Sequence, residues 1–159
     1  MASALNDKRT NVRIAVGANH SGHSLRAKVV EMLRQSGHEV VDVGVCDSKP
    51  VDYPDIAVLV AAKVGSGEVE RGILLGGTGM GMCIAANKLA GIRAVVCHDD
   101  VTAEISRRNN DANVLCMSAA LLGESLIHRL IETWLATPFE GGRHVRRLER
   151  ISMLERRKQ

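Results

Sequence analysis

Short, mainly apolar runs rich in β-branched residues alternate along this chain with longer amphipathic stretches, and this alternation is the feature that most constrains its fold. Strands that are apolar throughout are buried on both faces, which is typical of parallel sheets covered by helices on each side. The sequence therefore predicts an α/β fold. We expect a Rossmann-like, doubly wound, five-stranded parallel sheet in a three-layer α-β-α arrangement.

The apolar runs place the expected strands at residues 12–16, 38–43, 72–75, 93–97 and 114–117. Helical spacing predicts a helix that ends at Gly37, one over residues 55–64, one running to Leu89, and two over residues 101–108 and 123–136. A length of 159 residues fits one core. We expect residues 1–11 to form a flexible N-terminal segment and residues 12–159 to form a single domain.

The C-terminal segment is strongly basic and follows a break at Pro138 and Gly141-Gly142. Its apolar residues recur at helical spacing, which predicts a helix over residues 144–158. Two interpretations fit this helix: it is solvated at the chain's end, or it crosses onto a partner subunit. Composition does not decide between them.

Composition excludes several classes of protein. Hydrophobic residues make up 45% and charged residues 25%, which excludes disorder, and no apolar run reaches the roughly 18 residues of a membrane span. A net charge of +3 with one Trp, one Tyr and one Phe argues against a nucleic-acid partner. The four cysteines show no C-x-x-C spacing, so neither a metal site nor a disulfide framework is expected. The N-terminus has no signal-peptide pattern, and we expect a cytoplasmic protein with reduced thiols.

A glycine-rich loop, Gly76 to Gly81, follows the third expected strand and has four glycines in six residues. Backbone N–H groups in such a loop can hold a phosphate or a developing oxyanion. The loop is not a dinucleotide fingerprint, because Met82 stands where a glycine is needed, and no Gly-Lys-Ser/Thr makes it a phosphate-binding Walker loop. The alternative interpretation is a tight turn that serves only helix–strand packing.

Basic residues at two other places could bind an anion. Arg143 and Arg147 are four residues apart, which places them on one face of a helix and suits a doubly charged phosphate. His20 follows the first strand, at the rim where doubly wound sheets bind ligands. A solvated basic face and an ordinary surface histidine are the alternatives.

Several segments together resemble the ribose-5-phosphate isomerase type B family, which includes the galactose-6-phosphate isomerase subunits. They run in order from about Val12 to Arg157: Asn19-His20, Asp52-Tyr53-Pro54, G-G-T-G-M-G at 76–81, I-A-A-N-K at 84–88, G-I-R-A at 91–94, N-N-D-A-N-V at 109–114, and G-R-H at 142–144 with Arg147. The resemblance therefore covers nearly the whole chain.

This resemblance implies an aldose–ketose isomerase of a sugar phosphate without a metal or organic cofactor. The implied reaction converts D-ribose 5-phosphate to D-ribulose 5-phosphate through a cis-enediolate, as in the pentose phosphate pathway. The implied assembly is a homodimer or homotetramer in which two subunits share each active site.

The resemblance also implies a role for each matched residue. Thr78 assists proton movement, and His20, Arg143 and Arg147 bind the phosphate. The implied substrate contacts are Asn19, His20, Tyr53, Gly77, Thr78, Gly79, Met80, Gly81 and Asn110.

The chain departs from the family pattern at the catalytic positions. The family's base is a cysteine at the position of Gly76, or in some members a glutamate at the position of Met82. The ring-opening histidine aligns with Asn109. The aspartate before the first-strand histidine is Asn19, and a phosphate-binding arginine aligns with Ala120. The acid–base groups are therefore absent from their usual places.

Two hypotheses follow from these departures. In the first, the chain is an active isomerase with a relocated base; the candidates are Cys83, near the start of the helix after the glycine loop, and His98, at the end of the fourth strand. Burial in the core is the alternative for Cys83. In the second, the chain is a non-catalytic sugar-phosphate-binding paralogue or subunit. An engineered Gly76 would not explain the changes at Asn19 and Asn109.

Overall fold

The computed structural model describes residues 11–44 and 52–157. Apart from Asn11, the N-terminal segment expected at residues 1–11 lies outside these ranges. Cys46 and the last two residues also lie outside them.

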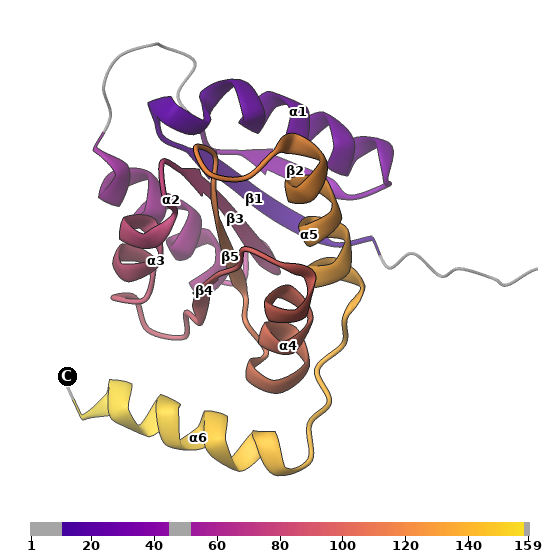
Figure 1. Ribbon diagram of the computed structural model, residues 1–159. Helices are drawn as coiled ribbons and strands as arrows, with labels where there is room; N and C mark the ends of the chain where they lie inside the picture. The colour runs from indigo at the N-terminus through magenta and orange to yellow at the C-terminus, as the bar shows by residue number, and fades with distance from the viewer. Residues whose placement is uncertain (1–10, 45–51, 158–159) are drawn as a thin grey trace, which may run out of the picture.

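A five-stranded parallel sheet forms the centre of the protein, which confirms the predicted fold class (Figure 1). The strand order is β2-β1-β3-β5-β4, with every pair parallel. The strands are β1 (Arg13–Ala18), β2 (Glu39–Asp42), β3 (Arg71–Gly76), β4 (Ala94–Val96) and β5 (Val114–Ser118). Because β5 lies between β3 and β4, the loops after β1, β3 and β5 are neighbours at the carboxyl edge of the sheet.

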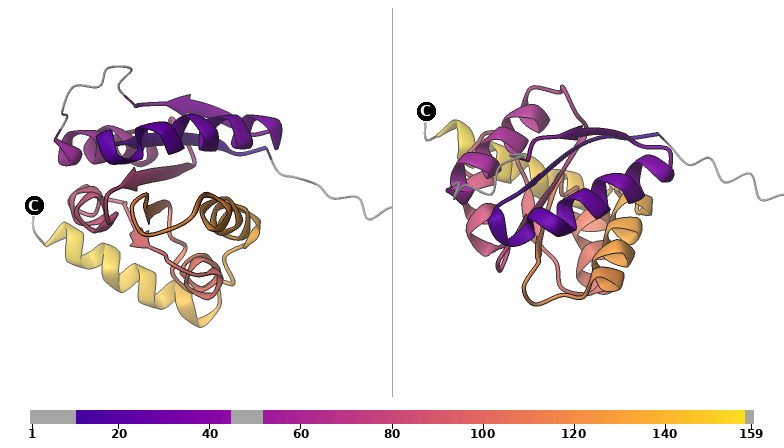
Figure 2. Two further views of the ribbon diagram at one scale, coloured as in Figure 1. Left: turned by 45° about the horizontal axis from the view of Figure 1, so that its top comes forward. Right: turned by 90° about the horizontal axis from the view of Figure 1, so that it is seen from above.

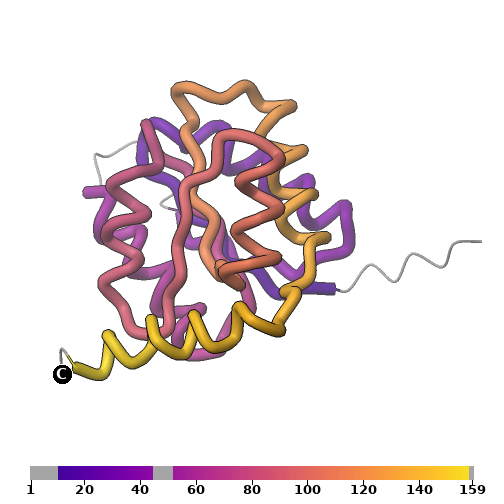
Figure 3. Tube along the Cα trace, turned by 60° about the horizontal axis from the view of Figure 1, so that its bottom comes forward, coloured from indigo at the N-terminus to yellow at the C-terminus, as the bar shows by residue number. Residues whose placement is uncertain are grey.

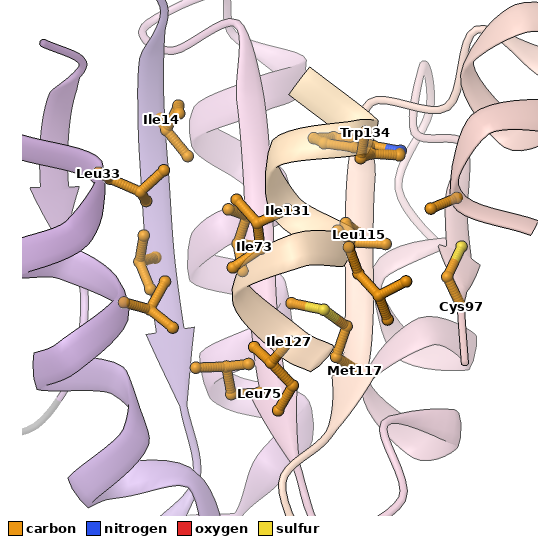
Figure 4. Close-up of a cluster of buried hydrophobic side chains, with 14 of the residues drawn as sticks. Ile14, Leu33, Ile73, Leu75, Cys97, Leu115, Met117, Ile127, Ile131 and Trp134 are labelled. Carbon is orange, nitrogen blue, oxygen red and sulfur yellow. The ribbon is translucent and has the colours of Figure 1, made fainter. Parts of the chain in front are cut away.

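Helices cover both faces of this sheet (Figure 2). One face packs against α1 (His23–Gln35), α4 (Asp100–Asn110) and α5 (Glu124–Ala136), and the other against α2 (Tyr53–Gly65) and α3 (Met80–Ala86). The first face holds the larger apolar cluster, in which Trp134, Leu115 and Ile73 are fully buried (Figure 4). The apolar residues of each strand thus reach both cores, as their continuous hydrophobicity predicts.

The ends of the elements differ slightly from the expected ones. The helix expected to run to Leu89 ends at Ala86, because the next residue, Asn87, is tied to strand β4. Its side chain donates to the Ala94 carbonyl at 2.9 Å and accepts from the Ala94 amide at 2.8 Å. The Asn87 side chain therefore fixes where β4 begins.

The C-terminal helix α6 (Arg143–Arg156) lies at the amino edge of the sheet, opposite the loops that follow the strands (Figure 1). Figure 3 shows it running across that end of the molecule. The Glu140 amide, just before α6, donates to the Arg108 carbonyl at 3.0 Å, and Glu155 near its end accepts from the Gly91 amide at 3.1 Å. Most of the helix is exposed, including Val145, Ile151 and Leu154. No helix within the described ranges is long and apolar enough to cross a membrane.

Candidate active site

The glycine-rich loop predicted from the sequence connects β3 to α3 at the carboxyl edge of the sheet. Gly79 adopts a left-handed conformation with φ +77°, and a Cβ there would lie 3.0–3.2 Å from backbone atoms of Met117. Both features require glycine, because an L side chain disfavours this conformation and the neighbouring backbone leaves no space. The loop therefore packs closely against the end of β5.

The end of β5 also fixes the first part of this loop. The Ser118 hydroxyl donates to the Gly77 carbonyl at 2.6 Å, and the Ala119 amide donates to the Gly76 carbonyl at 2.7 Å. Sequence reasoning missed Ser118; the signal that could have found it is a hydroxyl residue ending an apolar strand. Because the carbonyls of Gly76 and Gly77 accept hydrogen bonds from the end of β5, the loop is held in one orientation.

Most of the loop's amide groups remain available to a ligand. Within residues 77–83, the Met80 amide donates to Thr78 Oγ1 at 3.3 Å and the Cys83 amide donates to the Gly79 carbonyl at 3.1 Å. The other amides have no acceptor among the described residues; they belong to Gly77, Thr78, Gly79, Gly81 and Met82. A cluster of free N–H donors of this kind can hold an anionic oxygen.

The loop after β1 lies beside the glycine loop. Asn19 caps a short 3₁₀ turn, accepting a hydrogen bond from the Ser21 amide at 3.1 Å, and its own amide donates to the Leu75 carbonyl at 3.2 Å. The Ser21 hydroxyl lies 3.4 Å from His20 Nε2 and 3.9 Å from the place of a Cβ on Gly77. Asn19 and His20 are thus beside Gly77, with Ser21 as a neighbour that sequence reasoning did not single out.

Tyr53, at the start of α2, closes the other side of the loop. Its ring carbons lie 2.6–2.7 Å from the place of a Cβ on Gly81, so the absence of a side chain at Gly81 lets the ring pack there. The ring is 45% exposed, which leaves part of it free for a ligand. The predicted substrate contacts Asn19, His20 and Tyr53 therefore surround the glycine loop.

The family's two base positions are adjacent in the structure and both lack an ionisable group. A Cβ on Gly76 would lie 3.0 Å from the Met82 sulfur, and the Met82 side chain is buried. The methionine thus occupies the space beside Gly76. Its thioether cannot accept a proton from a sugar carbon near neutral pH.

The two candidate substitutes for the base lie elsewhere. The Cys83 thiol donates to the Ala94 carbonyl at 3.4 Å and packs against the core under α2 and α3. A hydrogen bond from the Cys116 thiol lowers the pKa of Cys83. His98 is exposed and follows β4, which is two strands away from β3, or roughly 10 Å at the usual strand spacing.

The remaining predicted residues lie at the opposite edge of the sheet. Asn109 and Asn110 end α4, and the Asn110 carbonyl accepts from Arg93, the residue just before β4. Arg143 and Arg147 are exposed on α6, and neither forms an ion pair within the described residues. In Figure 1 the loop that follows β5 lies in the upper half of the molecule and α6 at the bottom. The predicted site residues of one chain therefore form two groups at opposite edges of the sheet.

A partly buried ionic network shapes the turn that carries Asn110. Arg107 donates to Asp111 at 2.7 Å and to the Ala112 carbonyl at 2.6 Å, and its guanidinium lies 5.6 Å from the ring centre of Trp134. Arg93 also pairs with Asp111, at 3.1 Å. Asp111 has a φ of 45°, and these bonds hold it in that uncommon conformation. The turn then presents Asn110 to solvent.

No group of three or more His, Cys, Asp or Glu side chains that could hold a metal ion occurs in residues 11–44 and 52–157. The contacts above place two ionisable side chains, His20 and Tyr53, beside the glycine loop. The chemistry that the arrangement supports is the binding of an anionic oxygen next to hydroxyl and imidazole groups.

Comparisons with known proteins place these observations in a family. Residues 14–151 match the family model described as Ribose/Galactose Isomerase. Ribose-5-phosphate isomerase B of Escherichia coli K12 is 45% identical over 92% of this chain and 98% of its own length.

Solved structures agree with the sequence comparison. A Clostridium thermocellum ribose-5-phosphate isomerase B has a TM-score of 0.90 and 41% identity, covering 92% of this chain and 99% of the other. Ribose-5-phosphate isomerase B of Mycoplasma genitalium, solved with bound ribulose-5-phosphate, has a TM-score of 0.87 and 38% identity, covering 91% and 96%.

Proposed function

This chain belongs to the ribose/galactose isomerase family, and on that premise we propose that it interconverts D-ribose 5-phosphate and D-ribulose 5-phosphate. The observation that supports this proposal most is the cluster of free amides in the glycine loop, at the positions that match the family's motif. Residues of the loops after β1 and β3 then bind the sugar.

The proposed reaction needs those amides. Moving a proton between C2 and C1 of the open-chain sugar passes through a cis-enediolate, whose oxygens carry negative charge. N–H groups that point at a developing oxyanion each contribute about 2.7–4 kcal/mol of transition-state stabilisation. Thr78, whose hydroxyl oxygen already accepts from the Met80 amide, keeps its own O–H to donate to a substrate oxygen.

We further propose that two copies of the chain build each site. β3 has six residues and spans about 20 Å, whereas a five-carbon phosphate with bonds of about 1.5 Å reaches roughly half as far. One substrate cannot contact the glycine loop and Arg147 of the same chain. In a two-fold assembly, Arg143, Arg147 and Asn110 of one copy would face the glycine loop of the other.

The exposed apolar residues of α6 support such an assembly. Ile151 and Leu154 line a hollow of about 470 Å³ together with the turn that contains Leu89 and Ile92. A homodimer would bury this surface, and two dimers could pair into a tetramer. We also propose a cytoplasmic location, because three cysteines in the described residues are free thiols and oxidising compartments favour disulfides.

Solvent exchange tests the proposed reaction. The protein is incubated with ribose 5-phosphate in D₂O and followed by NMR. We expect ribulose 5-phosphate to form and deuterium to enter at the exchanging carbon. A Gly79→Ala variant that remains folded serves as the negative control, because its added Cβ displaces the loop from Met117. Absence of both product and deuterium with the unaltered chain would contradict the proposal.

The same geometry favours a second candidate, a sugar-phosphate-binding paralogue or subunit without activity. Its support is the buried Met82 beside Gly76, together with Asn109 at the ring-opening position. Each lost proton-transfer group typically removes about 10²–10⁴-fold in rate. Calorimetric binding of ribose 5-phosphate without any deuterium exchange would select this candidate, and absence of binding to pentose or hexose phosphates would eliminate both.

A further inference from the structure

Arg93, the residue just before β4, holds the end of α4 in place. Its Nε–H group donates to the Asn110 carbonyl at 3.1 Å and to the Asp111 carbonyl at 3.0 Å, and a terminal nitrogen donates to the Asp111 carboxylate at 3.1 Å. The last carbonyls of a helix have no partner within the helix, so a cation that reaches them stabilises its end. One guanidinium thus binds two consecutive residues of the turn after α4.

The backbone from which this side chain starts is fixed as well. The Arg93 amide donates to the side-chain oxygen of Asn113 at 2.8 Å, and the Arg93 carbonyl accepts from the Asn113 amide at 3.1 Å. The Asn113 side chain also donates to the Gly91 carbonyl at 2.8 Å. The Arg93 side chain is 26% exposed, so the protein shields most of its length from water. The guanidinium therefore connects a fixed point at the start of β4 to Asn110.

The neighbouring Arg107 has a different task. It binds Asp111 and the Ala112 carbonyl, which both follow Asn110, and it is buried. Among the side chains of residues 11–44 and 52–157, Arg93 alone forms a hydrogen bond with Asn110. The side-chain amide of Asn110 is exposed and has no partner within the same residues. The structure thus fixes the backbone of Asn110 through Arg93 and leaves its amide free for a ligand.

We propose that Arg93 is a positioning residue, which orients Asn110 for a hydroxyl group of the sugar. This inference rests on the proposed function, in which Asn110 of one copy contacts the sugar that the glycine loop of the other copy binds. Arg93 acts through the carbonyls of Asn110 and Asp111 and does not contact the substrate itself. Because the turn is ordered before the sugar arrives, binding does not have to order it, and less conformational entropy is lost.

Replacing Arg93 by lysine separates this orientation from the attraction of a positive charge for a phosphate. Lysine keeps the charge, but its compact ammonium group lacks the planar, forked donors that bind two carbonyls and a carboxylate together. We therefore expect Arg93→Lys to weaken the binding of ribulose 5-phosphate by roughly 3–10-fold, the contribution of one hydrogen bond. A role of charge alone predicts no change in affinity for this variant.

A double-mutant cycle tests whether Arg93 acts through Asn110. The affinity for ribulose 5-phosphate is measured by calorimetry for the unaltered full-length protein, Asn110→Ala, Arg93→Lys and the double variant. Each single variant should lose roughly 3–10-fold, and the double variant should bind as well as Asn110→Ala alone. A merely structural role of Arg93 would lower the affinity equally in both backgrounds. Arg108→Lys is the matched control; this exposed arginine, also near the end of α4, pairs with Glu104 at 2.7 Å, and its variant should bind like the unaltered chain.

Three results would overturn the proposal: an unchanged affinity in Arg93→Lys, an unchanged affinity in Asn110→Ala, or losses that add in the double variant. If Arg93→Lys does not fold, Asp111→Asn replaces it in the cycle. This variant removes the carboxylate that Arg93 binds, and asparagine tolerates the φ of 45° at this position. Additive losses or an unchanged affinity there contradict the proposal equally.

Amide hydrogen exchange measures the order of the turn without any ligand. The amides of Asp111 and Ala112 donate to the carbonyls of Arg107 and Ser106 at 3.1 and 3.0 Å, and these two bonds close the turn. We expect both amides to exchange several times faster in Arg93→Lys than in the unaltered protein. If the unaltered protein does not bind ribulose 5-phosphate, the proposed function fails by itself, and exchange then decides on Arg93: unchanged rates contradict its positioning of the turn.

Discussion

Replacing Gly79 by alanine tests the geometry of the glycine loop. Two costs add at this position. A left-handed conformation costs an L residue about 1–2 kcal/mol, and the new Cβ would lie 3.0–3.2 Å from the immobile backbone of Met117. Overpacking of this kind typically costs about 1–3 kcal/mol. We therefore expect Gly79→Ala to lower the free energy of unfolding by about 2–5 kcal/mol.

Two other glycines separate these costs. Gly91 has nearly the same φ, +76°, but no heavy atom lies within 4 Å of the position that an added Cβ would take. Gly91→Ala therefore carries only the conformational cost of about 1–2 kcal/mol. Gly77 is not in the left-handed region, and a Cβ added there would lie 3.9 Å from the Ser21 hydroxyl. Gly77→Ala is expected to change stability by less than about 1 kcal/mol in either direction.

Urea unfolding at one fixed protein concentration measures all three variants. With a slope of about 2 kcal/mol per M, the midpoint should fall by roughly 1–2.5 M for Gly79→Ala and by about 0.5–1 M for Gly91→Ala. Equal shifts for these two variants would refute the close approach of Met117 to the loop. A Gly77→Ala variant as unstable as Gly79→Ala would refute the assignment of the strain to Gly79.

Three further predictions concern the site's charges and thiols. Arg147→Ala should weaken the binding of ribose 5-phosphate by about 1.5–3 kcal/mol in calorimetry, the value of a charge-assisted contact, whereas Arg146→Ala should leave it unchanged. Equal losses of affinity in the two variants would remove Arg147 from the proposed phosphate site. Gly76→Cys combined with Met82→Ala restores a base and should raise kcat by up to about 10²–10⁴-fold; no gain in a folded variant would refute the base position. Because its pKa is lowered, Cys83 should react with iodoacetamide at a lower pH than Cys97, whose pKa is raised by burial. Peptide mass spectrometry that finds the reverse order would contradict this difference between the two thiols.

All five strands were predicted. The signal is strongest for β1, β3 and β5, because these strands are buried on both faces and carry that signal locally. Val114–Ser118 is such a run, and it forms β5 within one residue of the expected range. The position of β5 between β3 and β4 was not predictable, because strand order depends on contacts between distant segments. That order nevertheless decides which loops meet, and it brings Ser118 against Gly77.

The sequence indicated the chemistry of the site better than its geometry. The glycine loop and the spacing of Arg143 and Arg147 each suggested an anion, but the pattern cannot reveal that the two features lie at opposite edges of the sheet. The packing of Met82 beside Gly76 was also hidden, since it depends on how α3 rests on β3. Both depend on tertiary structure, which no local pattern records.

Mixing two variants tests the proposed shared site most directly. Gly79→Val is designed to disable the loop, and the double variant Arg143→Ala with Arg147→Ala removes the proposed phosphate clamp, which is this pair of arginines. Each variant alone should be inactive toward ribose 5-phosphate. After dissociation and reassociation at equal amounts, half of the two-fold dimers are mixed, and each has one site with both parts intact. About a quarter of the unaltered activity should then return. Activity that stays at zero in verified mixed dimers would show that loop and clamp do not meet across two copies.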